Sequence, residues 1–356
     1  MKKIASNCLF IKGYNHNLLI DIQNNTWYHI KENEEELISE KLNKSMKEYL
    51  EKEAILINIP EQFIKNFPKL DLNYYSFSKI ETIIIDIDSN TKFNVINVIK
   101  KLENANPMLL QLRYFTEVNV KSLIEILDFL KYTTIESLEV ILPYSDKTFF
   151  LLNDKNIIDK YGKLRRLIIH SVNNQKIEDS VSSKIMFSTE IIENNLNCGQ
   201  ISYFNFSNVS SQILKSMNYN SCLYKKIGID VEGNIKNCPS LNTKLGNVFD
   251  ENLELNFENK LFQTESIKKD DIEVCKDCEF RHICMDCRAF TDSKKRPNAR
   301  PSKCQYNPYI SKWSHEDGYY SLQDSGIISN ENEFSIDHLK IKKINDKLNN
   351  VNLNII

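Results

Sequence analysis

Apolar and β-branched residues alternate with polar turns over the first 60 residues of the chain. Three short runs, CLFIKG, NLLIDIQ and TWYHI, predict strands. The next stretch, EEELISEKLNKSMKEYLEKE, places Leu37, Leu42, Met46 and Leu50 at roughly helical spacing and predicts helix. Strands followed by helix within so short a segment favour a small winged-helix-like module, which we assign to residues 1–53.

From residue 54 to residue 205 the pattern changes to nearly continuous Ile, Leu and Val runs. AILINI, IETIIIDI, MLLQLRY, SLEVILP, LRRLIIHS and KIMFS predict strands, and KFNVINVIKKLEN and NVKSLIEILDFLKYT predict helices between them. Apolar strands that alternate with helices are typical of a mainly parallel sheet buried on both faces. The expected fold class is therefore α/β, either an open parallel sheet or a partial (β/α) barrel with right-handed crossovers.

The rest of the chain is different in character. Short segments flanked by cysteines fill residues 206–313, and a polar tail over residues 314–356 ends in a predicted helix, DHLKIKKINDKLN. We therefore expect four consecutive parts, namely the N-terminal module, the α/β domain over 54–205, a cysteine-rich domain and the tail.

Composition and charge exclude several classes of protein. The chain has 356 residues and a formal net charge of −2, which argues against a general nucleic-acid binder because such binding needs a basic face. No run reaches the roughly 18 apolar residues of a membrane span, and the first residues lack the apolar core of a secretory signal. We expect a cytoplasmic protein without membrane or nucleic-acid partners, whose nine cysteines are metal ligands or core thiols rather than disulfides.

Eight of the cysteines gather in the last part of the chain. The segment CLYKKIGIDVEGNIKNC predicts a hairpin that turns at VEGN, and a C-x2-C-x5-C-x2-C run follows it. Thiolate ligands must converge on a metal at about 2.3 Å each, and C-x2-C turns allow this. All-sulfur ligand sets favour zinc or iron–sulfur. Two centres account for the eight candidate ligands: Cys198, Cys222, Cys238, Cys275, Cys278, Cys284, Cys287 and Cys304. Cys8 stands alone in an apolar run and is interpreted as a core thiol.

This cysteine pattern resembles the SPASM domain, the C-terminal extension of many radical S-adenosylmethionine peptide-modifying enzymes. The text IGIDVEGNIKNCPS and DDIEVCKDCEFRHICMDCR is similar to the maturase of grasp-with-SPASM systems, which works beside an ATP-grasp ligase on a ribosomally made precursor. The resemblance implies up to two [4Fe–4S] clusters. Cys275, Cys278, Cys284 and Cys304 would hold one, and Cys222, Cys238 and Cys287 the other.

Two features of the ligand sets depart from the family pattern. Only two residues separate Cys284 from Cys287, where the usual pattern has three. The second set is one thiol short, and Cys198 is either its fourth ligand or a structural residue.

The motif that starts radical chemistry is absent from the sequence. No CxxxCxxC occurs, and the first half of the sheet region contains no Gly-Gly-Glu segment. We therefore expect no S-adenosylmethionine as cofactor. The region 54–205 is interpreted as a degenerate form of the radical enzyme barrel or as an unrelated α/β domain. Asp86 and Asp88, two apart at a strand end, are candidates for acid/base work or plain strand-end carboxylates.

The predicted function is that of an iron–sulfur protein in peptide maturation, binding the precursor and acting with an ATP-grasp ligase as scaffold or accessory maturase. In the N-terminal module an extended peptide would add to a sheet edge. The candidate peptide-binding residues are Leu18, Ile20, Ile22, Trp27 and Tyr28. The alternatives are a packing role for that module, a redox or group-transfer enzyme that uses its clusters, and a zinc-stabilised structural protein.

Overall fold

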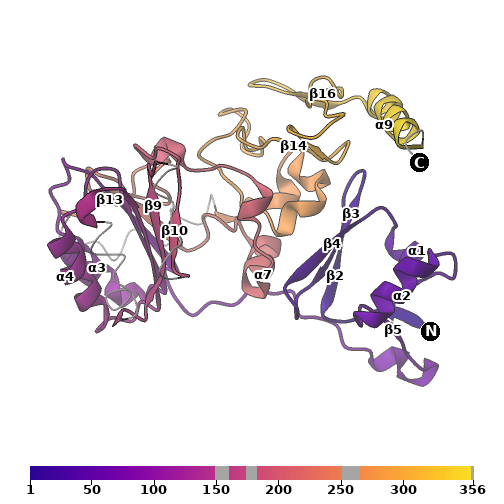
Figure 1. The fold of residues 1–356 in the computed structure, drawn as a ribbon, viewed down its shortest axis with the longest axis horizontal. Coiled ribbons are helices and arrows are strands. Elements are labelled where there is room, and N and C mark those ends of the chain that lie inside the picture. Colours follow the sequence, from indigo (N-terminus) through magenta and orange to yellow (C-terminus); the bar gives the residue numbers. More distant parts are fainter. Residues whose placement is uncertain (149–159, 174–182, 251–264, 354–356) are drawn as a thin grey trace. The chain divides into compact units, whose positions relative to one another are not determined.

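A computed structural model describes residues 1–148, 160–173, 183–250 and 265–353. The chain forms two compact units, and each is assembled from segments distant in sequence (Figure 1). The first unit comprises Met1–Tyr74, Gln200–Ser221 and Ser266–Ile356, and the second comprises Tyr75–Gly199 and Cys222–Glu265. These units do not coincide with the four consecutive parts expected from the sequence. Each unit combines a segment from before residue 200 with one or more segments from after it.

An eight-stranded sheet forms the centre of the second unit and confirms the α/β class. The strands from β10 to β11 run parallel, and β12 and β13 continue the sheet in antiparallel sense. In spatial order they are β10 (Ile185–Phe187), β9 (Leu164–His170), β8 (Ser137–Pro143), β7 (Leu109–Tyr114), β6 (Thr82–Ile87), β11 (Lys226–Ile229), β12 (Asn234–Lys236) and β13 (Gly246–Asn247).

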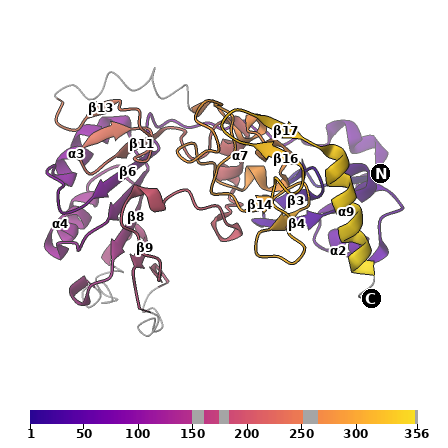
Figure 2. The ribbon, with the colours of Figure 1, turned by 90° about the horizontal axis from the view of Figure 1, so that it is seen from above.

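Two helices pack side by side on one face of this sheet (Figures 1 and 2). α3 (Val95–Leu102) begins at Asn94 and α4 (Val120–Leu130) begins at Asn119. Each asparagine side chain accepts a hydrogen bond from a backbone N–H of the first helical turn, which satisfies a group that the helix leaves unpaired. The apolar faces of both helices and the Ile, Leu and Val side chains of the strands form one core.

Two findings correct the sequence-based picture, and a third bears on an alternative that the sequence left open. The run AILINI does not enter the large sheet, because its strand β5 (Leu56–Asn58) pairs with β1 (Lys2–Ile4) in the first unit. Residue 205 is not a boundary of the sheet, since β11, β12 and β13 follow it. Among the described residues the strands form an open order rather than a ring, which agrees with the open-sheet alternative.

The N-terminal part of the first unit contains the predicted strands and helix. The antiparallel strands β2 (Cys8–Lys12), β3 (Asn17–Asp21) and β4 (Thr26–Ile30) precede α1 (Glu34–Ile38) and α2 (Lys44–Lys52). β3 is central and is buried on both faces. Leu19 packs with the helices, whereas Leu18 and Ile20 pack against Phe280 and Ile283 of the cysteine-rich segment. This module therefore shares a core with residues far along the chain.

The remainder of the first unit has short elements and one long helix. Its helices and strands are α7 (Ser210–Asn218), β14 (Tyr306–Asn307), β15 (Lys312–Trp313), β16 (Ile327–Ser329), β17 (Phe334–Ile336) and α9 (His338–Leu353). The 3-10 segments among the described residues are η1 (Glu61–Asn66), η2 (Glu103–Ala105), η4 (Asn195–Asn197), η5 (Tyr203–Asn205), η6 (Lys269–Asp271), η7 (Cys275–Asp277) and η8 (Glu279–His282). α9 confirms the predicted tail helix. No helix within the described ranges is long and apolar enough to cross a bilayer.

A buried ion pair joins the two central strands of the sheet. Asp86 of β6 and Arg113 of β7 face each other in register, with Nε–Oδ1 and Nη2–Oδ2 distances of 2.6 and 2.8 Å. Asp86 is 1% exposed and Arg113 6%. Asp86 is thus committed to the fold, and the acid/base role considered for it is not supported by this geometry.

Replacing Arg113 by methionine should lower the free energy of unfolding of the second unit by about 3–5 kcal/mol, because Asp86 is left buried without its partner. Denaturant unfolding followed by circular dichroism measures this. The matched control is Arg166→Met, since the Arg166 side chain is 55% exposed in its pair with Glu139 and should change stability by about 0–1 kcal/mol. Equal effects of the two variants would contradict the prediction.

Candidate metal centres

Four of the predicted ligands converge on one cavity of the first unit. The thiols of Cys275, Cys278, Cys284 and Cys304 line a cavity of about 30 Å³. Its other walls include the aromatic rings of Phe206, Phe280, Tyr306 and Trp313. This is the set that the family resemblance assigned to a single cluster. A small, largely apolar cavity lined by four sulfurs suits a metal centre held away from water.

Short turns bring these cysteines together in place of regular secondary structure. The backbone N–H of Cys278 donates to the carbonyl of Cys275 at 3.0 Å, as the C-x2-C spacing predicts. Val274, just before, has a φ of +66°, and the N–H of Cys275 donates to Glu273 at 2.7 Å across it. Positive φ at a β-branched residue costs of order 1–3 kcal/mol and persists only where the surroundings hold it. Val274 is 4% exposed, so packing holds this turn.

A buried lysine lies beside the same four thiols. Lys269 is 4% exposed, and its Nζ lies 3.8 Å from Cys275 Sγ and 3.6 Å from Cys284 Sγ. Burial alone would lower the pKa of Lys269, but the thiolates of Cys275 and Cys284 and the Asp286 carboxylate raise that pKa well above its usual value. Beside thiolates the Lys269 ammonium would therefore stay charged, and it would offset the negative charge that the sulfurs carry when they bind a metal.

Burial has the largest effect on the pKa values of the thiols themselves. Burial raises the pKa of Cys275 and of Cys278, and it raises the pKa of Cys284 to about 12. These thiols hold their protons at neutral pH unless a metal replaces them. Binding a metal would then release protons, and loading should become easier as the pH rises.

A second group of thiols lies in the other compact unit. Cys222 precedes β11, and Cys238 follows β12, so the predicted hairpin with Gly233 in its turn (φ +81°) is confirmed. Lys226, 7% exposed, places its Nζ 3.0 Å from Cys222 Sγ. Burial lowers the pKa of Lys226, but the thiolates of Cys222 and Cys238 outweigh this and raise it. Each thiol group thus has its own buried lysine.

Cys198 belongs to this second group. The Asn195 side chain donates to the carbonyl of Pro239 at 3.0 Å, and the Ser240 hydroxyl donates to the carbonyl of Asn195 at 3.0 Å. These bonds tie the loop before Cys198 to the turn after Cys238. Charge on Cys198 affects the pKa of both Cys238 and Lys226. The loop thus brings Cys198 to the remaining thiols of its unit.

The other two cysteines, Cys8 and Cys287, belong to the first unit. The family resemblance groups Cys287 with Cys222 and Cys238. Cys8 packs in the core between the N-terminal strands and helices, and burial followed by the Asp21 charge raises its pKa to about 12.

A close backbone approach shapes the second group. A Cβ on Gly228 would lie 2.1 Å from Cδ and 2.4 Å from N of Pro239, and 2.8 Å from the carbonyl carbon of Cys238. Only glycine lets β11 lie this close to the chain that carries Cys238.

The candidate peptide-binding residues differ in solvent exposure. Leu18 and Ile20 are 0% exposed and lie on the central strand β3, so neither their side chains nor their strand edge can receive a peptide. Ile22, Trp27 and Tyr28 are half-buried. β4, which carries Trp27 and Tyr28, is an outer strand of its three-stranded sheet. Strand addition is therefore confined to β4 or β2.

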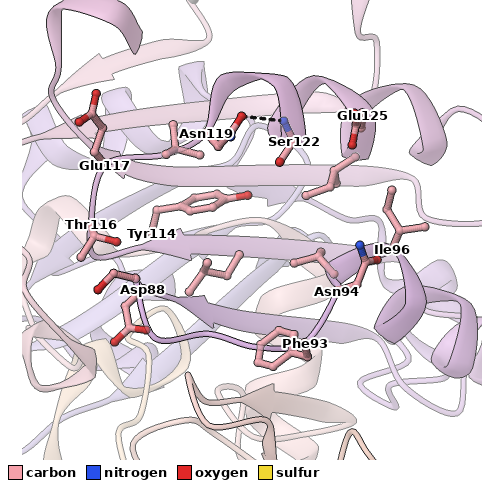
Figure 3. Close-up of a pocket in the computed structure, with 15 residues that line it drawn as sticks. Asp88, Phe93, Asn94, Ile96, Tyr114, Thr116, Glu117, Asn119, Ser122 and Glu125 are labelled. Atoms are coloured by element: carbon pink, nitrogen blue, oxygen red, sulfur yellow. Dashed lines mark hydrogen bonds between the residues drawn. The ribbon is translucent and has the colours of Figure 1, made fainter.

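A larger pocket lies where β6 and β7 end and the helices α3 and α4 begin (Figure 3). Its volume is about 480 Å³. Asp88, Glu117 and Glu125 supply carboxylates, and Tyr114 and Phe93 supply aromatic surface. The sequence analysis singled out only Asp88 here. The signal that marks such a pocket is polar residues after neighbouring parallel strands, because those strand ends share one edge of the sheet.

Comparisons with known proteins give little further constraint. No protein-family model and no curated protein matches this chain. Among solved structures, the crystal structure of Streptococcus suis SuiB bound to S-adenosylmethionine covers 86% of this chain and 100% of its own, with 15% sequence identity and a TM-score of 0.30. A second crystal structure of Streptococcus suis SuiB covers 85% and 100%, with 13% identity and a TM-score of 0.32. Likeness at this level does not establish a shared fold or function.

Replacing Gly228 by alanine should displace the backbone at Cys238 and destabilise the second unit by about 1–3 kcal/mol, the usual cost of overpacking. Cys238 is 6% exposed in the wild-type structure. In the metal-free Gly228→Ala variant its thiol should become reactive toward a thiol reagent. Gly162→Ala is the control, since nothing lies within 4 Å of its added Cβ. A Gly228→Ala protein with wild-type melting and thiol reactivity would refute this account of the glycine.

Proposed function

We propose that this chain is an iron–sulfur protein of the SPASM type that serves in maturation of a ribosomally synthesised peptide. It binds the precursor and acts beside an ATP-grasp ligase as scaffold or accessory maturase. The observation that carries the proposal is the convergence of four cysteine thiols on one cavity beside the buried Lys269. The peptide and the ligase come from the resemblance of the sequence around the cysteines.

The first cluster would be held by Cys275, Cys278, Cys284 and Cys304. The apolar walls and the lysine support a group whose ligands carry negative charge, because buried charge needs a nearby opposite charge. A bound [4Fe–4S] cluster would supply one-electron chemistry, or a rigid cross-link if its redox state never changes. The chain itself excludes water from the sulfurs and sets the charge beside them.

The second cluster would be held by Cys222, Cys238 and Cys287, the set that the family resemblance implies, with Cys198 as the candidate fourth ligand. The buried Lys226 supports this assignment for the same electrostatic reason as Lys269. Four thiolates also bind zinc well, and a zinc-stabilised protein is the alternative that metal analysis separates. Because the radical motif is missing, the chain's own contribution is binding and orientation, unless its clusters serve a redox or group-transfer step.

The precursor peptide would add to the outer edge of β4. Trp27 and Tyr28 are consecutive, so their side chains leave opposite faces of the strand. Trp27 packs on Phe280 with ring centroids 5.6 Å apart, and Tyr28 packs on Tyr49 at 5.9 Å. A strand anchored on both faces presents a rigid edge, and backbone hydrogen bonds to that edge would supply the affinity. Leu18 and Ile20 would support the edge from the central strand β3, and Ile22 from the turn that follows it.

Metal analysis tests the cluster assignment. Anaerobically reconstituted protein should hold about eight irons with matching sulfide, for two four-iron clusters. Cys278→Ala should lose about four of them, since it removes one ligand of the first set, while the sheet of the second unit stays folded. Cys8→Ala is the control and should keep all the iron. Two zincs without acid-labile sulfide would overturn the iron proposal and favour the zinc alternative.

Hydrogen exchange tests peptide binding. A precursor peptide chosen from the gene neighbourhood should slow amide exchange across β4 (Thr26–Ile30), because its backbone would pair with that edge. Exchange in the β16–β17 hairpin should stay unchanged and serves as the internal control. Protection confined to the loops that line the pocket of Figure 3, or no protection anywhere, would rule out β4 as the recognition strand.

A further inference from the structure

Three side chains outside the cysteine groups come together in the first unit. His16 lies in the turn between β2 and β3, His29 lies on β4, and Glu279 begins the segment η8. One ligand atom from each lies within 4.8 Å of those from the other two. The two imidazole rings meet edge to face with centroids 4.6 Å apart. His29 and Glu279 are 250 residues apart in sequence.

Two buried polar atoms of this group have no hydrogen-bond partner within the described part of the chain. Glu279 is 0% exposed, and its Oε2 is one of them. His16 Nδ1 is the other. Glu279 Oε1, in contrast, contacts His29 Nε2 at 2.7 Å and accepts a hydrogen bond from the Tyr306 hydroxyl. An ion pair between His29 and Glu279 gives Glu279 Oε1 a partner but gives none to Glu279 Oε2 or His16 Nδ1. Buried polar atoms are rarely left unpaired.

We propose that His16, His29 and Glu279 form a binding site for one divalent transition-metal ion, with zinc as the expected occupant. Two imidazole nitrogens and one carboxylate are a ligand set that zinc takes at about 2.0–2.2 Å, with a fourth position for water. A bound ion would use both unpartnered atoms and separate His29 Nε2 from Glu279 Oε1. Coordination through His29 Nε2 would place the proton of the neutral ring on Nδ1.

The surroundings orient this ligand set. The Tyr306 hydroxyl fixes the Glu279 carboxylate, in the way that outer groups commonly orient metal ligands. A Cβ on Gly13 would lie 2.2 Å from the carbonyl oxygen of His16 and 2.9 Å from Cβ of Glu279. Glycine at position 13 thus lets the turn that carries His16 pass close to Glu279.

The charge state of the group suits a metal. Burial, with the charges of His29, Lys31 and Lys312, lowers the pKa of His16 to about 4, so its ring is neutral at pH 7 and its nitrogen lone pair is available. Lys31 and Lys312 oppose an added cation, and the Glu279 carboxylate offsets them. The site would join the N-terminal sheet to the segment that follows Cys278. The proposal holds whichever metal binds the thiols and whether or not the protein binds a peptide.

Zinc stoichiometry in the full chain tests the site. Protein with its thiol centres filled beforehand is titrated with Zn²⁺ alone in a calorimeter and then analysed for bound metal after gel filtration. Wild type should bind one further zinc per chain. Glu279→Gln, which keeps the side-chain shape and an acceptor for Tyr306, and His16→Gln should each lose that equivalent. His315→Gln, an exposed histidine outside the group, should retain it.

The readout is a difference between matched proteins, so it remains valid if the thiol centres hold zinc instead of iron. Zinc should also raise the melting temperature of wild type and His315→Gln but not of the two site variants, and their circular dichroism should match wild type without zinc. Equal zinc content in wild type and both site variants, or no zinc beyond the thiol centres, would overturn the proposal. Failure of the iron–sulfur assignment would leave this difference unchanged.

Discussion

Contacts between a buried lysine and cysteine sulfurs constrain the interior of both units. A thiol in an apolar interior keeps its proton, and a lysine in the same interior would lose its own. Lys269 and Lys226 each lie within 4 Å of thiols that would become anionic on binding a metal, so each pair of charges could be buried together. An ammonium at this distance would offset the charge of a thiolate.

The cysteine-rich segment has little regular secondary structure of its own. Its backbone runs through single 3-10 turns, and the turn at Val274 is strained. It also supplies Phe280 and Ile283, which cover the β3 side chains Leu18 and Ile20. The N-terminal sheet is in turn complete only when that segment is in place. A truncation that removes the first strands would disturb the thiol centre, so the two parts cannot be treated as separable modules.

The sequence predicted local structure well where hydrophobic pattern decides it. Hydrophobic periodicity predicts the strand Thr82–Ile87 and the helices after Asn94 and Asn119, and turn chemistry predicts the hairpin at Gly233. It could not say which strands pair, because a run of apolar residues fits any buried strand position. Hence β5 was expected in the large sheet and β11 outside it. The four thiols of the first cavity were grouped in advance only through a family resemblance. His16, His29 and Glu279 carry no sequence signal, since nothing in the spacing links a hairpin turn, a strand and a residue far downstream.

The shared core of the first unit has a consequence for how the protein is made. Ile20 leaves the ribosome long before Phe280, and the roughly 260 residues between them take about 10–50 s to synthesise at ~5–20 residues per second. Throughout that interval one face of the N-terminal sheet is without its covering side chains. In the large sheet, β6 likewise pairs only with β7 until β11 has been synthesised. A nascent chain that exposes two apolar surfaces should bind chaperones. Its yield in a cell should then depend on translation speed as well as on the stability of the folded protein.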